Sequence, residues 1–311
     1  MATGIVTFQE FDELRPLLSV GTPAHSPWVD IYAFEEFRAA RITQPPARQA
    51  FYTVVFCQSA DYTHQLSTFT NAVAGPMVLF IPPGIRHSFT ADTTGVRGFT
   101  LFVKAEFLYA GVDNGRFLTD FPFFRLDVNP VLHLTPAQAA GLTDWFERIR
   151  YELTHLHPYR MPLVRSYVTA LLWQCRHLFE QSPVRSAQPN PSAGDGVSPG
   201  HRPLRLAQAF DALIQEHGVL HKDVGFYADR LRLSAVHLSD QVRWVTGQSA
   251  AERIRYWLME EAKRLLLATD LGAAETGYRL GFEDPAQFSK VFRRLVGVPP
   301  GQWQRKVRRL A

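Results

Sequence analysis

Short runs of β-branched and aromatic residues dominate the first half of this 311-residue chain. Residues 51–58, 76–81 and 96–104 are such runs, and the last alternates apolar with polar or small side chains. A period of two is typical of strands that bury one face, and turn residues such as Pro82-Pro83-Gly84 separate the runs. The pattern predicts a small antiparallel barrel or sandwich.

Two amphipathic helices are expected after these strands, over Thr135–His155 and Leu163–Phe179. Thr135-Pro136 is a favourable N-cap and first helical residue, and apolar side chains then recur at helical spacing in both segments. The two helices offer more apolar surface than a small barrel needs for cover, so they predict a homodimer formed by the first half.

A stretch rich in Pro, Gly and Ser, residues 182–202, has little to bury and predicts a flexible linker. It divides the chain into a strand-rich domain, residues 1–181, and an all-helical domain, residues 203–311. A chain of this length has room for two domains. The expected class is therefore α+β multidomain.

The helical half contains two segments that each predict a short helix, a tight turn and a second helix. In the first, Asp223 and Ser234 are the expected N-caps and Gly247 the expected end. In the second, Gly281-Phe282 makes the turn and Asp284-Pro285 starts the next helix, with Gln287 placed for a capping box. The expected buried stripe of that last helix consists of Phe288, Val291, Phe292 and Leu295.

Between these segments, residues 251–267 predict a helix about 25 Å long at 1.5 Å per residue. With the width of the flanking motifs, the two turn-linked helices would lie about 34 Å apart, one turn of duplex DNA. The pattern therefore favours a protein that enters two successive major grooves.

These segments closely resemble the AraC/XylS family of transcription regulators over about 100 residues. The residues that carry the resemblance are Ser234, His237-Leu238, Val245-Thr246-Gly247, Ala262-Lys263-Arg264-Leu265-Leu266-Leu267, Gly281-Phe282-Glu283-Asp284, Phe288-Ser289-Lys290-Val291-Phe292-Arg293-Arg294 and Gly297-Val298-Pro299-Pro300. The chain departs from the family pattern at Asp240, where a basic residue is usual, at Val242, and at Thr276-Gly277, where Ile-Ala is usual.

The resemblance implies that both second helices contact double-stranded DNA. We expect Gln287 and Lys290 to lie at base edges, and Arg293 and Arg294 mostly to bind phosphate. Asp240 would repel phosphate but could accept a hydrogen bond from a cytosine amino group. The full expected DNA-binding set is Val236, Ser239, Asp240, Arg243, Ala286, Gln287, Lys290, Arg293 and Arg294.

The segment Pro82-Pro83-Gly84-Ile85-Arg86-His87 resembles the second motif of cupin barrels. Cupin enzymes bind a metal through that His and an earlier His-x-His pair, but this chain has only His64 in the expected stretch. We therefore expect no metal and no other cofactor. Family members with a cupin-like domain use it to bind a small effector, to dimerise, or both. The expected effector-site residues, which could equally be ordinary barrel core, are Tyr52, Val54, Phe56, Phe80, His87 and Phe99.

The charge distribution agrees with a polyanion partner at one end of the chain. From Arg202 onward there are 18 Lys and Arg against 12 Asp and Glu, whereas the preceding residues have 15 against 17. No apolar run is long enough to span a membrane and no signal peptide is evident, so a cytoplasmic protein is expected. Cys57 and Cys175 lie among apolar neighbours and predict buried, reduced thiols.

The leading hypothesis is a transcription regulator that binds specific DNA and responds to a small effector, with RNA polymerase as a further candidate partner. Two alternatives remain at this point. One is a regulator controlled by dimerisation alone. The other is a cupin-type metal enzyme fused to a DNA-binding module.

Overall fold

The computed structural model describes residues 6–21, 24–37, 41–59, 61–66, 69–92, 95–109, 117–125, 128–182 and 201–308. The chain forms two compact units: one contains the β-strands and two long helices, and the other contains the helices from residue 201 onward. The predicted linker falls almost wholly outside the described residues. Its first residue, Ser182, and its last two residues are exceptions, and the last two begin the first helix of the second unit.

The first unit contains two five-stranded sheets within the described residues. One has the order β1-β3-β8-β5-β6 and the other β10-β7-β4-β9-β2, and only the β1–β3 pairing among them is parallel. The strands are β1 (Val6–Phe8), β2 (Val29–Ala33), β3 (Arg41–Gln49), β4 (Tyr52–Ser59), β5 (Asp61–Leu66), β6 (Phe69–Ala74), β7 (Met77–Ile81), β8 (His87–Asp92), β9 (Arg97–Val103) and β10 (Val131–His133).

The three predicted strands are confirmed as β4, β7 and β9, which are neighbours in one sheet. No strand was expected at β3, which contains Pro45-Pro46. Its pairing with β8 shifts register between Gln44 and Ala47, at these two prolines. Proline lacks the N–H that the hydrogen-bond ladder of a sheet needs. A strand can therefore contain proline where its pairing is already irregular.

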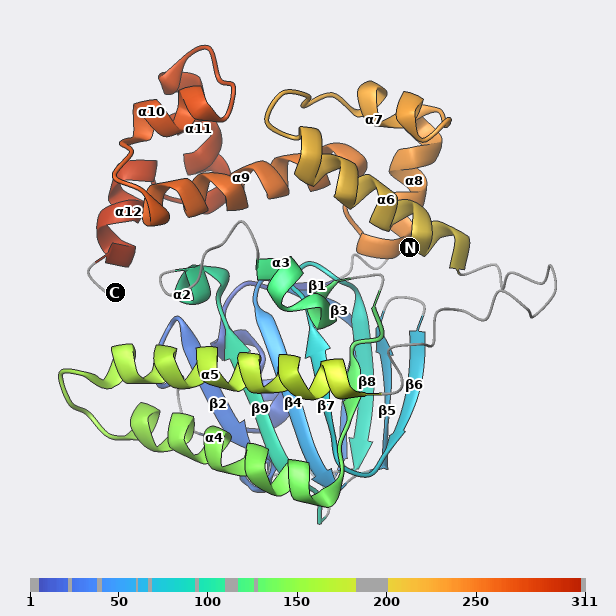
Figure 1. The fold of residues 1–311 in the computed structure, drawn as a ribbon, viewed down its shortest axis with the longest axis vertical. Helices are drawn as coiled ribbons and strands as arrows, with labels where there is room; N and C mark the ends of the chain where they lie inside the picture. Colours follow the sequence, from blue (N-terminus) through green and yellow to red (C-terminus); the bar gives the residue numbers. More distant parts are fainter. Residues whose placement is uncertain are drawn as a thin grey trace. The chain divides into compact units, whose positions relative to one another are not determined.

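Helices α4 (Pro136–Thr154) and α5 (Arg160–Gln181) lie across the sheet that contains β2, β9, β4 and β7 (Figure 1). Thr135 caps α4 through a reciprocal capping box with Gln138, as its sequence favours. His155 is the C-cap of α4, at the end of the predicted helix. Shorter elements of the chain are η1 (Phe11–Glu13), α1 (Arg15–Leu18), η2 (Phe34–Glu36), α2 (Ala105–Tyr109), α3 (Phe117–Asp120) and η4 (Pro122–Phe124).

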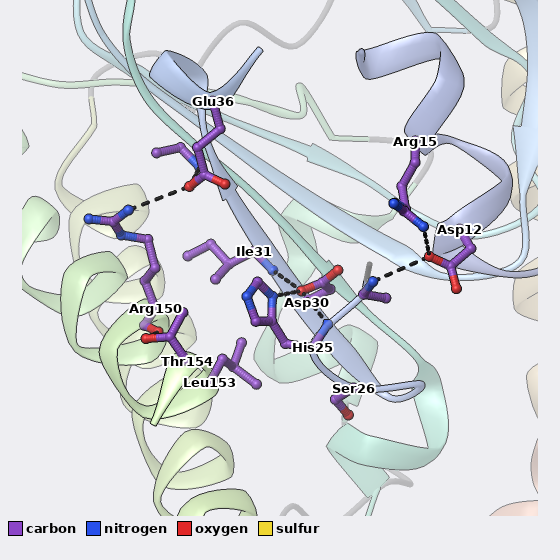
Figure 2. Close-up of polar contacts among 12 residues, drawn as sticks. Asp12, Arg15, His25, Ser26, Asp30, Ile31, Glu36, Arg150, Leu153 and Thr154 are labelled. Atoms are coloured by element: carbon purple, nitrogen blue, oxygen red, sulfur yellow. Dashed lines mark hydrogen bonds and ion pairs between the residues drawn. The ribbon is translucent and has the colours of Figure 1, made fainter. Parts of the chain in front are cut away.

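A polar cluster joins the start of the chain to β2 (Figure 2). The fully buried Asp30 contacts His25 through Oδ1 and Nδ1 at 2.7 Å, and its Oδ1 also accepts from the backbone N–H of Ile31. The side-chain hydrogen bond between His25 and Asp30 is the main cause that raises the pKa of His25. Nearby, Arg150 of α4 forms an ion pair with Glu36 of η2 at 3.4 Å, which ties the helix to the sheet edge.

The second unit consists of short helices around one long one. They are α6 (His201–His217), α7 (Val224–Arg230), α8 (Ala235–Thr246), α9 (Ala250–Ala268), α10 (Ala273–Arg279), α11 (Pro285–Val296) and α12 (Pro300–Arg308). The two predicted helix–turn–helix segments are confirmed as α7–α8 and α10–α11, and α9 lies between them (Figure 1).

Candidate nucleic-acid interface

Helices α7 and α8 form the first helix-turn-helix motif, and a small residue lies at their contact. Ala228 of α7 is 2% exposed and shares a buried cluster with Leu238 and Val242 of α8. Phe210 and Ile214 of α6 and Ala250 and Ile254 of α9 also belong to this cluster. The buried stripe of α8 therefore leaves its opposite face for other contacts.

Side-chain caps fix the ends of these helices. The Asp223 carboxyl accepts a hydrogen bond from the backbone N–H of Phe226 at 3.0 Å, and the Ser234 hydroxyl accepts one from His237 at 3.2 Å. Gly247 ends α8 with a φ of 71°, a left-handed conformation that favours glycine. The three caps are those that the sequence predicts.

The exposed face of α8 carries a mixed set of side chains. Val236 is 71% exposed, and the side chains of Asp240 and Arg243 are 62% and 58% exposed. Arg243 lies 3.9 Å from Asp240, so the acidic side chain has a cation beside it. Trp244 is 53% exposed and lies four residues after Asp240. The sequence interpretation missed it, although this spacing places it on the same face.

Ser239 differs from the other expected contacts on α8. It is half-buried, and its hydroxyl accepts a hydrogen bond from the backbone N–H of Ala250 at 3.3 Å. Ala250 is the first residue of α9, so Ser239 ties the first motif to the long helix.

In the second motif, a glycine in α10, Gly277, permits close contact with α11. A Cβ on Gly277 would lie 3.1 Å from Cβ of Phe288, tighter than ordinary van der Waals contact. The ring of Phe288 lies 5.7 Å from that of Phe292, which in turn lies 5.9 Å from Trp303 of α12. These fully or nearly fully buried rings hold α11 on its inner face.

The start and the stripe of α11 differ from expectation in two details. The Asp284 carboxyl accepts from the backbone N–H of Ala286 at 2.8 Å, instead of forming the expected capping box with Gln287. Val291 and Leu295 were predicted to be buried, but Val291 is half-buried and Leu295 is 47% exposed. The buried stripe is therefore narrower than the apolar pattern suggests.

All five residues of α11 in the expected DNA-binding set are exposed. Within the described ranges, its three cationic side chains form no ion pair with an acidic side chain. They are Lys290, Arg293 and Arg294. The helix thus has one face of buried aromatic rings and one face of uncompensated positive charge, an arrangement suited to phosphate and base edges. These residues are Ala286, Gln287, Lys290, Arg293 and Arg294.

The spacing of the two exposed faces depends on α9. Its 19 residues span about 28 Å at 1.5 Å per residue. Ser249 caps it through a capping box with Glu252, and its buried side chains recur along one stripe. A continuous helix of this length is a rigid spacer between two short motifs.

Comparison with known proteins also identifies a helix-turn-helix domain in the second unit. A family model described as a helix-turn-helix domain matches residues 227–306. The HTH-type transcriptional activator RhaR of Enterobacter sp. (strain 638) is 32% identical over 127 residues, which cover 41% of this chain and 43% of that protein. The MmsAB operon regulatory protein of Pseudomonas aeruginosa is 26% identical over 111 residues, covering 34% and 36%.

The solved DNA-binding domain of AdpA, in complex with a target DNA, is 28% identical, with a TM-score of 0.31. Its match covers 33% of this chain and 93% of that domain. The chain spans less than half the length of the two curated relatives. On the family model and the sequence relatives, the helical unit is an AraC/XylS-type helix-turn-helix domain.

The three departures of this AraC/XylS-type domain from the family pattern each have a structural setting. At Thr276-Gly277, the glycine makes the close contact with Phe288, while the Thr276 hydroxyl is buried without a hydrogen-bond partner among the described residues. Asp240 is exposed beside Arg243, and Val242 is fully buried in the motif core. The Val242 and Thr276-Gly277 departures therefore affect packing, whereas Asp240 affects the exposed face.

Five of the six effector-site residues expected in the other unit do not face the interior between the sheets. Phe56 and Phe99 stack on Phe146 of α4, with ring centroids 5.0 and 5.5 Å apart. Val54 lies on the same face of β4 as Phe56, two residues away. These side chains are buried by the helix layer, so their assignment to the barrel interior was wrong.

The same holds for the two remaining aromatic candidates. Phe80 stacks on Phe123 at 3.8 Å, and the Tyr52 ring lies 4.7 Å from Phe124. The opposite face of this sheet belongs to a buried cluster that also contacts Phe89 of the other sheet. Both faces of β4 and β7 are buried, so alternation alone could not tell which one faces the interior. The inward side chains of these two strands include Val55, Cys57, Leu79 and Ile81.

His87 is the exception, because it does lie in the interior. It is 3% exposed, and Nε2 of Gln44 donates a hydrogen bond to its Nε2 at 2.9 Å. Burial lowers the pKa of His87 to about 4, so the ring is neutral at pH 7 and its Nδ1–H donates to the carbonyl of Ile85. Among the described residues, no three His, Cys, Asp or Glu side chains are arranged to hold a metal ion.

Two further observations concern the whole described chain. Cys57 and Cys175 are both buried free thiols, and burial raises the pKa of each. In the part of the chain that the structure describes, no helix has both the length and the hydropathy needed to cross a membrane.

Proposed function

We propose that this chain is a sequence-specific DNA-binding regulator of transcription whose helices α8 and α11 enter successive major grooves. The observation that carries the proposal is the exposed, uncompensated cationic face of α11 opposite its buried aromatic rings, repeated in part by the exposed face of α8 across α9. The relatives are transcription regulators, which supports a regulator more than an enzyme.

A fragment of residues 201–311 tests this function. It should bind duplexes selected from random sequence, with affinity that falls steeply as salt rises, because phosphate contacts release counterions. Binding can be measured by fluorescence anisotropy at several salt concentrations against random competitor DNA. A folded fragment that prefers no duplex over the competitor would refute the proposal.

Within this fragment, we propose that Gln287 and Lys290 contact base edges, while Arg293 and Arg294 bind phosphate. Gln287→Ala should change which sequence is preferred, because one good base contact contributes about 1–3 kcal/mol to discrimination against the wrong base. Arg294→Ala should weaken all sequences alike and reduce the salt slope by about 1. Equal losses on every sequence from both variants would contradict this division of roles.

On α8, we propose that Val236 contacts a thymine methyl group and that Asp240 accepts a hydrogen bond from a cytosine amino group. Arg243, beside Asp240, would offset the repulsion between that carboxyl group and phosphate. Ser239 is less suited to a base contact, because its hydroxyl already bonds the start of α9. Site selection with Ala variants at these positions, in the same assay, tests each role.

We further propose that the strand-rich unit forms a homodimer through α4 and α5. Exposed apolar side chains on these helices support this: Tyr151 is 60%, Leu163 36% and Trp173 46% exposed. A fragment of residues 1–181 should sediment as a dimer at micromolar concentration. A monomer under these conditions would contradict the proposal.

The same unit is the proposed site of a small-molecule effector. The interior polar pairs support this, namely Gln44 with His87 and Gln49 with Thr53, since buried hydrogen-bonding groups can exchange partners with a bound ligand. Screening ligands for a rise in the melting temperature of the 1–181 fragment tests the idea. If no ligand alters DNA binding by the intact protein, the regulator controlled by dimerisation alone is the better account.

Control of transcription places such a regulator beside RNA polymerase, which is a candidate second partner. It also places the protein in the compartment that holds the chromosome, which in a bacterium is the cytoplasm.

A further inference from the structure

The segment between α6 and α7 contacts the turn of the second motif, although it belongs to the first. Gly218 follows the end of α6, and a Cβ there would lie 2.5 Å from the Trp257 ring of α9. The chain is therefore in close contact with the long helix α9 at the point where α6 ends. The next residues, Val219 to Lys222, reach the turn between α10 and α11.

Three observations define this contact. The ammonium group of Lys222 donates a hydrogen bond to the carbonyl oxygen of Gly281, 59 residues away in the sequence. The same Nζ lies 4.1 Å from the centroid of the Phe282 ring, a cation–π distance. Gly281 has a φ of +68°, and a Cβ there would lie 2.8 Å from the carbonyl oxygen of Val219, so the two backbones touch.

The surroundings of Lys222 strengthen this contact. Partial burial lowers the pKa of Lys222, and the nearby carboxyl group of Glu283 opposes that shift. Hydrogen bonds from a partly desolvated ammonium group are stronger than those in water. The two loops are thus joined by a hydrogen bond, a cation–π contact and a close backbone approach at one place.

The consequence concerns the relative orientation of the motifs. The first motif packs on α9 through a buried cluster, and α10 and α11 of the second motif also contact α9. A short helix pair can rotate slightly about such an attachment. A contact that joins the loop before α7 directly to the turn before α11 restricts this rotation. The exposed faces of α8 and α11 then keep a fixed angle and separation.

We propose that Lys222 is a positioning residue that fixes α11 relative to α8. It thereby sets the spacing that the protein accepts between two half-sites, the DNA segment that α8 contacts and the one that α11 contacts. This inference rests on the proposed DNA-binding function. Lys222 acts through Gly281 and Phe282, so it needs no contact of its own with DNA. Its loss should therefore change spacing preference while leaving the recognition of one half-site unchanged.

The test uses the full chain and an operator that the wild-type protein selects from random duplexes. Affinities are measured for that operator, for versions with one or two base pairs inserted or removed between half-sites, and for a single half-site. Lys222→Met keeps the aliphatic stem but loses the donor, and Lys222→Arg restores a cationic donor. The ratio of affinities across spacings cancels any general effect of removing one positive charge.

Wild type should prefer one spacing, and Lys222→Met should reduce that preference about tenfold, the equivalent of one charged hydrogen bond. Single half-site affinity should stay within about twofold, and Lys222→Arg should restore most of the preference. An unchanged spacing preference in Lys222→Met overturns the inference, as does an equal loss on the single half-site. If wild type selects no operator, the proposed function fails instead.

A second pair of variants keeps the inference testable if Lys222→Met unfolds. Gly281→Ala would push the two loops apart, whereas Gly297→Ala adds the same methyl group at a comparable φ of +90° with no atom within 4 Å. Only Gly281→Ala should broaden the spacing preference. Equal behaviour of the two proteins overturns the inference.

Discussion

The Gly98→Ala protein is expected to lose the folded state of its strand-rich unit. An added Cβ would lie 2.0 Å from the carbonyl oxygen of Phe56 and 3.0 Å from the carbonyl carbon, at a φ of +154°. Gly98 pairs with Cys57 at a register shift between β4 and β9, two strands inside the sheet. Neither backbone can move aside without breaking the ladder, so we expect a cost above about 4 kcal/mol.

Gly75→Ala is the matched control for this prediction. Gly75 also has a positive φ, +83°, but no atom lies within 4 Å of the added methyl group. It should cost only about 1–2 kcal/mol, from the backbone conformation alone. Differential scanning calorimetry of the two full-length proteins makes the comparison. Similar melting profiles would show that the sheet accommodates a side chain at Gly98.

Gly98→Ala also separates the proposed roles of the two units. The helical unit has its own buried clusters and does not depend on this ladder. The variant should therefore lose dimerisation and any effector response, while its helical unit still binds the operator. Sedimentation and anisotropy measurements on one preparation report both properties.

Phe292→Ala is expected to abolish specific DNA binding by destabilising the second motif. Phe292 is fully buried between Phe288 and Trp303, so truncation removes ring contacts on both sides and leaves a cavity. Comparable core truncations cost about 3–5 kcal/mol. Because α11 is held on this unit by these rings, its exposed cationic face would no longer be presented in one orientation.

The control lies on the same helix. Leu295→Ala removes a side chain that is 47% exposed, so it should change the free energy of unfolding by no more than about 0.5 kcal/mol. Urea unfolding of the 201–311 fragment and its operator affinity measure both effects. A loss from Leu295→Ala as large as that from Phe292→Ala would contradict the structural account of the stripe.

Local chemistry made much of the helical unit predictable. Caps such as Asp223 and Ser234 satisfy backbone groups within three residues, and Gly247 ends its helix by a conformation of its own backbone. Such signals act within one turn of chain, so the order and bounds of α7, α8, α10 and α11 follow from the sequence. The strands β4, β7 and β9 were equally clear, because β4 and β7 are rich in β-branched and apolar residues and β9 alternates apolar with polar or small ones.

Other features depended on partners distant in the sequence. Alternation in β4 separates its two faces, but only the α4 ring of Phe146 decides that Phe56 faces the helices and not the other sheet. Leu295 has the spacing of a buried residue, yet no element covers it. Likewise, Lys222 meets Gly281 only when both motifs pack around α9. The sequence by itself determined the helices of the two motifs, the strands β4, β7 and β9, and the chemistry of α11, because caps and periodicity are local. The tertiary structure alone decided which faces meet, because burial depends on what lies opposite.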